Sequence, residues 1–230
     1  MSDVLNNLND VVKQIHEMFN SLEKYSLNDP NDKCLKFLPK NGIYVIFENG
    51  EKFLNSDMDR IVRVGTHKGE NRLLKRLKSH YHIRGINDRS IFRKHIGRAI
   101  ICKEKKDLDF LELWGKTFVS RESKKDPRYN QEYFEKKRFY EDKVDNYVQN
   151  NIRFTVIPVE SEEKRLYFEG KLISTLSWSS FTPASENWLG NFSPIEKIRN
   201  SRLWNVNELF KQPLSDEDFE QLMKIFNSMK

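Results

Sequence analysis

The chain has 230 residues, 32% of them charged, and its 40 lysine and arginine residues exceed its 34 acidic residues to give a net charge of +6. This length is enough for one sizeable core, and the positive charge favours a polyanionic partner. A mean hydropathy of −0.75, together with short apolar runs, excludes a membrane-spanning helix. Because Cys34 and Cys102 show no paired spacing and residues 1–7 lack the features of a secretory signal, we expect a reducing, cytoplasmic compartment.

The N-terminal segment carries an apolar residue at every third or fourth position between residues 4 and 22. This spacing predicts an amphipathic helix over residues 1–25. We expect its apolar face to pack on the core or on a partner subunit, so a homodimer is one possible assembly. Residues 27–39 contain Asn-Asp-Pro turn chemistry and form the expected linker to the first strand.

Two strands are predicted next, over residues 42–47 and 60–64, because both segments are rich in β-branched and aromatic residues. The first begins with Gly42-Ile43-Tyr44, so a phenol can lie at the edge of the sheet. The second strand ends at Gly65, which indicates either a tight turn at the end of the strand or the close approach of another group to the backbone. The intervening loop, residues 48–59, is long.

A basic helix is predicted over residues 72–81. Arg72, Arg76 and His80 are spaced four residues apart, so we expect them to form one stripe opposite the leucines of the helix. Arginine suits phosphate because its planar fork donates two parallel hydrogen bonds. Taken alone, such a stripe is more often a solvated helix face.

A second helix, over residues 162–176, has an apolar stripe at positions 166, 173 and 176, and Glu169 falls on that stripe. A carboxylate in such a place is usually paired, protonated or bound to a cation, because burying an unpaired charge is expensive. The two alternatives at this point are a metal-binding glutamate and an ion pair with Lys171 or Arg165.

The remaining segments complete an α+β plan: helices over residues 90–102 and 133–148, an edge strand over residues 152–159, an extended run over residues 201–206 and a final helix from about Ser215. We therefore expect a small mixed or antiparallel central sheet flanked by helices. The expected units are an N-terminal helix and linker (1–30), a central domain (31–198) with a helical insertion around residues 103–150, and a C-terminal extension (199–230).

The ordered set of motifs resembles the GIY-YIG nucleases over roughly residues 42–191. It consists of Gly-Ile-Tyr, a strand that ends in Val-Gly, Lys-Arg followed by a histidine on a helix, and a glutamate just before Leu-Ile. The resemblance implies a small mixed sheet flanked by helices and hydrolysis of DNA phosphodiester bonds with one bound divalent metal, Mg²⁺ or Mn²⁺.

The resemblance also implies a role for individual residues. Tyr44 matches the tyrosine that helps to activate water, Arg76 the arginine that binds phosphate, and His80 a supporting histidine. Glu169 matches the glutamate that binds the metal. Asn187 is the best match for an asparagine that follows the glutamate helix in the family.

One position departs from the family pattern, because Arg63 stands where the second motif has a tyrosine. An arginine cannot act as a phenolic base, but it can contact phosphate. The residues expected to contact DNA are Arg63, Lys68, Arg72, Lys75, Arg93 and Lys94. The main alternative is a binding protein that keeps the fold and has lost turnover, and a third reading is a subunit of a larger defence or repair assembly.

Overall fold

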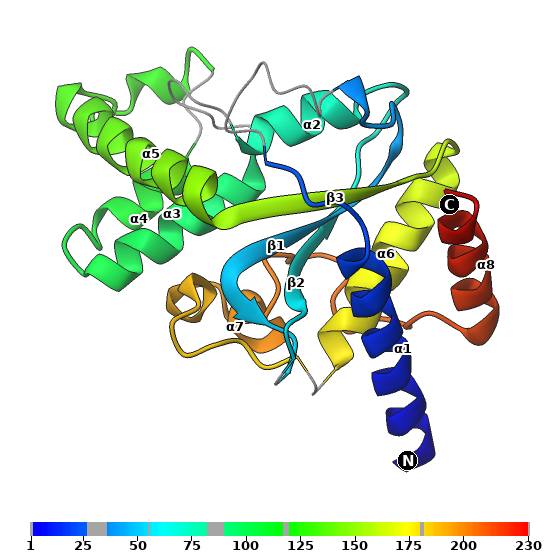
Figure 1. Ribbon diagram of the computed structural model, residues 1–230. Coiled ribbons are helices and arrows are strands. Elements are labelled where there is room, and N and C mark those ends of the chain that lie inside the picture. The colour runs from blue at the N-terminus through cyan, green and yellow to red at the C-terminus, as the bar shows by residue number, and fades with distance from the viewer. Residues whose placement is uncertain are drawn as a thin grey trace.

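The computed structural model describes residues 2–26, 36–54, 56–81, 90–116, 120–179 and 182–229. Its centre is an antiparallel sheet of β1 (Gly42–Lys52), β2 (Asp59–Gly65) and β3 (Ile152–Pro158), in the order β2-β1-β3 (Figure 1). Residue Tyr44 in the middle strand faces Gly65 on one side and Val156 on the other. The expected α+β class is confirmed, and β3 lies at the edge of the sheet as predicted.

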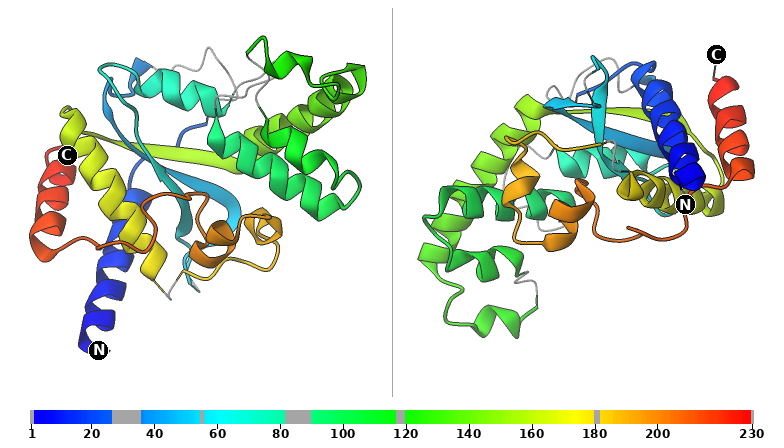
Figure 2. Two further views of the ribbon diagram at one scale, coloured as in Figure 1. Left: turned by 180° about the vertical axis from the view of Figure 1, so that it is seen from behind. Right: turned by 90° about the horizontal axis from the view of Figure 1, so that it is seen from below.

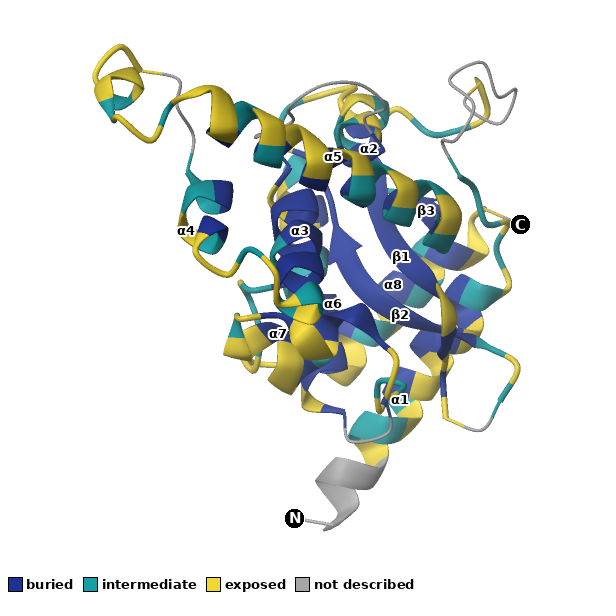
Figure 3. Cartoon of the chain, turned by 90° about the vertical axis from the view of Figure 1, so that its left-hand side faces the viewer, coloured by how far each residue is buried: buried dark blue, intermediate teal, exposed yellow. Residues whose placement is uncertain are grey.

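Both faces of the sheet are covered, because alternate residues of β1 point into two separate hydrophobic clusters. Tyr44 and Ile46 join the cluster that contains α2 (Leu73–His80), α3 (Ile91–Glu104), α4 (Phe110–Gly115) and α5 (Gln131–Asn151). Ile43, Val45 and Phe47 join the cluster on the opposite face. Figure 3 shows the strands of the sheet coloured as buried.

The second face is covered by α1 (Ser2–Asn20), α6 (Glu162–Trp178) and α8 (Asp216–Asn227), which pack together beside the sheet (Figure 2). The N-terminal helix buries Val12, Ile15 and Phe19 in this cluster, and the C-terminal helix adds Leu222 and Phe226. Both terminal helices therefore belong to the same core as the sheet. Among the described residues, no helix is long and apolar enough to cross a membrane.

Several element boundaries differ from the sequence-based expectation. The first helix ends at Asn20 and is shorter than predicted. Strand β1 continues to Lys52 and β2 begins at Asp59, so the connection between these two strands is shorter than expected. The connector after α3 contains the short helix α4 and a 3₁₀ turn at Ser123–Lys125, and the segment before α7 (Glu196–Ser201) contains a 3₁₀ turn at Leu189–Phe192. These short elements escape prediction because each has too few residues to show periodicity.

The outer edge of β2 is covered by the extended residues 203–205. The Trp204 amide donates to the Val62 carbonyl at 2.7 Å. Asn205 then accepts from the Val64 amide at 3.1 Å and donates to the Val64 carbonyl at 3.0 Å. An uncovered strand edge invites pairing with another chain, and this segment removes that edge from solvent.

His16 joins α1 to the sheet through both of its ring nitrogens. Its Nδ1 lies 2.8 Å from the Val12 carbonyl and so donates, while its Nε2 accepts from the Ile61 amide at 3.2 Å. This arrangement needs a neutral ring, and burial lowers the pKa of His16 to about 4.

We therefore predict that the free energy of unfolding falls as the pH drops from 7 to 5. Over this range the unfolded chain binds a proton at His16 that the folded protein does not, which amounts to about 2 kcal/mol for this group alone. Burial lowers the pKa of His95 as well, to about 3, so this group acts in the same direction as His16. Urea unfolding at pH 7, 6 and 5 measures the change, and a constant unfolding free energy would contradict the assignment.

Candidate active site

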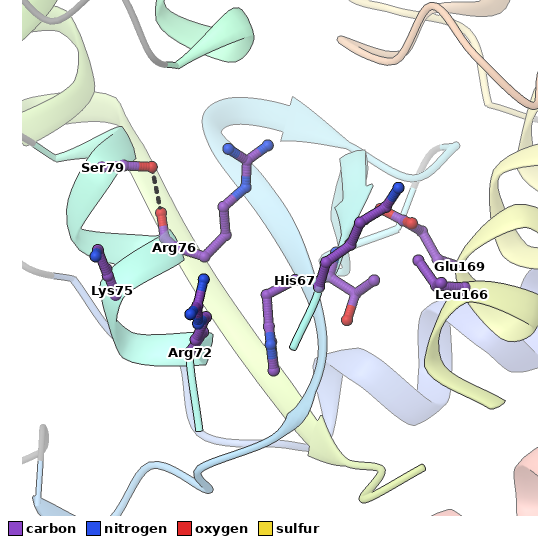
Figure 4. A pocket seen from close by; sticks show the side chains of 9 residues that line it. His67, Arg72, Lys75, Arg76, Ser79, Leu166 and Glu169 are labelled. Atoms are coloured by element: carbon purple, nitrogen blue, oxygen red, sulfur yellow. Dashed lines mark hydrogen bonds between the residues drawn. The ribbon is translucent and has the colours of Figure 1, made fainter. Parts of the chain in front are cut away.

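A pocket of about 450 Å³ lies between α2 and α6. Figure 4 shows the side chains of α2 on one wall and Glu169 with Leu166 of α6 on the other. The loop between β2 and α2 forms the rest of the wall. The lining residues are Thr66, His67, Lys68, Arg72, Lys75, Arg76, Ser79, Leu166 and Glu169.

Glu169 projects from α6 to the end of β2, where its Oε1 accepts a hydrogen bond from the Thr66 amide at 3.0 Å. Burial raises the pKa of this carboxyl, whereas the nearby positive charges of Arg63 and Arg76 and the Thr66 hydrogen bond act in the opposite direction. Glu169 has no other hydrogen bond or ion pair within the described part of the chain. One carboxylate oxygen therefore remains available to a ligand.

The stripe predicted around Glu169 is wrong in one respect. Leu166 is 37% exposed and lines the pocket beside Glu169, whereas the buried side of α6 is formed by Phe168, Leu172 and Leu176 among others. The Glu169 side chain therefore lies on the pocket wall beside Leu166 and not in the hydrophobic core. The two suggested ion-pair partners are engaged elsewhere, because Lys171 pairs with Asp218 and Arg165 with Glu70.

The pocket is lined by four basic side chains: Lys68, Arg72, Lys75 and Arg76. Within the described residues none of these side chains donates a hydrogen bond or forms an ion pair. Elsewhere, by contrast, basic residues such as Arg60 and Arg153 are held by carboxylates. A group of unpaired cations around one hollow is an electrostatic site for a polyanion.

Tyr44 and His80 lie directly beneath this pocket and are fully buried. The Tyr44 hydroxyl is 2.8 Å from His80 Nε2, and His80 Nδ1 is 2.9 Å from the Ser90 hydroxyl. Burial lowers the pKa of His80 well below its usual value, and Arg63, Arg76 and Arg93 act in the same direction. The ring is therefore neutral, so one nitrogen donates and the other accepts.

The predicted stripe of Arg72, Arg76 and His80 is not observed. The helix begins at Leu73, and His80 lies with Leu73 and Leu77 on the buried side of α2. The reason is that the neighbouring helix α3, which starts next to Ser90, covers the C-terminal end of α2 and holds the imidazole by a hydrogen bond.

Arg63 is also below the pocket and is only 8% exposed. Its guanidinium donates to the Trp204 carbonyl at 3.0 Å, lies 5.2 Å from the centre of the Phe92 ring, and interacts with the Tyr44 hydroxyl. Burial lowers the pKa of Arg63, whereas Tyr44 and Glu169 help to keep it charged. The arginine in the second motif therefore supports Tyr44 from the interior and does not line the pocket.

The structure places Arg93 and Lys94 in the interior and not on a DNA-facing surface. Arg93 is 1% exposed and pairs with Glu141 and Asp145 of α5, and the Lys94 ammonium donates to the Gly115 carbonyl at 3.4 Å. Both side chains fasten α3 to the helices around it. The expectation that they contact DNA is therefore wrong for the folded protein.

The role assigned to Asn187 stays a prediction, and the structure draws attention to a second asparagine, Asn205. Asn187 is exposed on a loop, whereas Asn205 is 6% exposed and holds both backbone groups of Val64, next to Gly65 and Thr66. No local pattern marks Asn205, because its partner strand lies about 140 residues earlier in the chain. His67 and Ser79, which line the pocket, were likewise not singled out by the sequence.

The comparison with protein families agrees with this geometry. A family model described as the GIY-YIG domain matches residues 2–229. Because the match covers nearly the whole chain, the protein belongs to the GIY-YIG nuclease superfamily. No curated protein and no solved structure matches the chain.

Gly65 allows the tight packing beneath the pocket, because a Cβ at this position would lie 2.3 Å from the Tyr44 hydroxyl. We predict that Gly65→Ala displaces the phenol from His80 and destabilises the protein by about 1–3 kcal/mol or more. Thermal unfolding measures the loss, and a wild-type melting temperature would contradict the packing. Tyr44→Phe is the milder control, because it keeps the ring and removes only the hydroxyl.

Proposed function

We propose that the protein is a metal-dependent endonuclease that hydrolyses phosphodiester bonds in DNA. The observation that carries the proposal is the pocket, in which one half-buried carboxylate faces four cations that have no ion-pair partner among the described residues. Cleavage of a phosphodiester needs positive charge around the phosphoryl oxygens and a carboxylate that holds a divalent cation. The family membership supports the same reaction class.

The residues present fit a Mg²⁺ or Mn²⁺ ion held by Glu169. Glu169 is the single carboxylate among the described residues that line the pocket, and these residues contain no cluster of three or more metal-ligating side chains. Mg²⁺ is commonly bound by one or two carboxylates together with substrate phosphate and water. When bound, the ion supplies charge that stabilises the oxygen leaving the phosphorus.

The basic residues of α2 supply the complementary charge. Arg76 lies on the wall opposite Glu169 (Figure 4), so a phosphate between them receives hydrogen bonds from the guanidinium on one side. Lys75 and Arg72 extend the positive wall along the helix. We assign Arg76 to the phosphate that is cut and the other cations to the DNA backbone around it.

Tyr44 and His80 form the pair that orients or deprotonates the attacking water in this proposal. If His80 donates through Nδ1 to Ser90, its bare Nε2 accepts a hydrogen bond from the Tyr44 hydroxyl and orients it, while the Arg63 guanidinium lies on the other side of the phenol oxygen as a positive charge. Because the phenol is buried in the free protein, this role requires the backbone of residues 65–66 to shift when DNA binds. Asn205, which holds Val64, is the positioning residue for that segment.

The alternative is a DNA-binding protein of the same fold without turnover. The burial of Tyr44 and the replacement of the second-motif tyrosine by Arg63 favour it. The two functions differ in one measurable property, because only the nuclease nicks DNA when a divalent metal is present.

For the nuclease, Glu169→Gln should abolish Mg²⁺-dependent nicking of supercoiled plasmid while DNA binding persists. The amide keeps the size and the Thr66 hydrogen bond but loses the charge that attracts the metal. Glu163→Gln on the exposed side of the same helix is the matched control and should nick like wild type. Nicking by the Glu169 variant at the wild-type rate would contradict the assignment.

Replacing a phosphate-binding cation should change the salt dependence of binding. We predict that Arg76→Ala weakens duplex binding in EDTA and lowers the slope of log K against log salt by about 1. Lys78→Ala removes the same charge from an exposed position outside the pocket. Equal effects of the two substitutions would mean that net charge, and not the pocket, binds DNA.

A further inference from the structure

His67 is a buried histidine on the pocket wall for which the proposed reaction has no use. It is 5% exposed and lies between the cations of α2 and the acid of α6 in Figure 4. Its Nδ1 is 3.0 Å from the Gly69 carbonyl. Its Nε2 is buried and has no hydrogen-bond partner within the part of the chain that the structure describes.

The tautomer of His67 follows from this geometry. A carbonyl oxygen only accepts, so Nδ1 carries the hydrogen, and in the neutral ring Nε2 is a bare acceptor. A buried polar atom without a partner is costly, and one on a pocket wall is a candidate for contact with a ligand. The unpartnered nitrogen is thus an observation independent of the unpaired cations.

The loop that carries His67 is held rigidly. The Gly69 amide donates to Glu162, its carbonyl also accepts from buried Arg165 at 3.0 Å, and its backbone has a positive φ of 75°. The Asn71 amide is bound by Asn41 at 2.7 Å. These hydrogen bonds to the backbone of Gly69 and Asn71 therefore hold the His67 imidazole on the pocket wall.

The charged groups around His67 belong to α6 and to the loop that carries His67 itself. Arg165 and Glu162 face it from α6, and Glu70, Lys68 and Arg72 belong to its own segment. The Arg72 side chain lies over Gly69, since its Nε would be 3.3 Å from a Cβ there. Burial and Arg165 lower the pKa of His67, so without a ligand the ring is neutral near pH 7.

We infer that the wall formed by His67, Lys68 and Arg72 binds a second phosphate of the DNA strand, next to the one that is cut, and that His67 takes up a proton when this phosphate binds. The inference rests on the proposed function, because it assigns a further subsite for the same DNA. His67 lies between Arg72 and Glu169 in Figure 4, and Lys68 lines the same pocket.

Proton uptake follows from the chemistry of the pair. A phosphate oxygen has only lone pairs, so it repels a bare Nε2 but accepts a hydrogen bond from a protonated one. The negative charge of the phosphate favours the imidazolium and offsets the opposing effect of Arg165. Binding and protonation are therefore linked, and affinity increases as the pH falls.

The test is the affinity for a fluorescein-labelled 20-base-pair duplex in EDTA, measured by anisotropy between pH 8.0 and pH 6.0. We expect wild-type affinity to rise by about three- to tenfold as the pH falls, with up to one proton bound per complex. His67→Asn keeps an amide donor near the Gly69 carbonyl and removes the titrating nitrogen, so its affinity should be lower and should lose this rise. His67→Gln, which places a permanent donor near the Nε2 position, should bind with little dependence on pH.

The Lys78→Ala variant is the control for general electrostatics and should keep the wild-type dependence on pH. A His67→Asn variant whose affinity rises with falling pH as much as that of wild type would overturn the inference and leave the nuclease proposal intact. Absence of duplex binding by the wild-type protein at every pH would instead overturn both. Circular dichroism at pH 6.0 verifies that each variant is folded.

Discussion

The site depends on how the end of β2 is fixed. At Gly65 and Thr66 the backbone meets the phenol of Tyr44 from the middle strand, the carboxylate of Glu169 from α6 and, one residue earlier, the amide of Asn205. These three contacts come from the sheet, a helix and the C-terminal segment. In the free protein the geometry of the pocket wall therefore depends on the packing of the whole core.

The distribution of charge reinforces this arrangement. Inside the molecule, two buried arginines are compensated by acids: Arg60 by Glu51, and Arg93 by Glu141 and Asp145. Burying such pairs adds little net stability, but removing one partner is costly, so they hold elements in fixed positions. The pocket shows the opposite arrangement, with unpaired cations around one carboxylate. This contrast separates charges that hold the fold together from charges that are available to a polyanion, a distinction that net charge alone does not make.

The strands, the main helices and the family could be predicted from the sequence, because each rests on a local pattern. Tyr44 and Glu169 were found through ordered motifs, and the structure places Glu169 on the pocket wall. The errors concern residues whose environment is set by distant segments. Arg93 was taken for a surface cation because its partners lie on α5, about 50 residues away. Asn205 escaped notice because it binds a strand far earlier in the chain, and the burial of His80 depends on α3.

The covering of β2 by residues 203–205 also bears on how the protein is made. All three strands and the candidate site residues of α2 and α6 precede this segment in the chain, so the outer edge of β2 lacks this cover until the segment is synthesised. A nascent chain that stops at residue 198 would contain every motif of the family and still expose an unpaired strand edge, which promotes association with other chains. The C-terminal segment thus covers the sheet edge last in the order of synthesis.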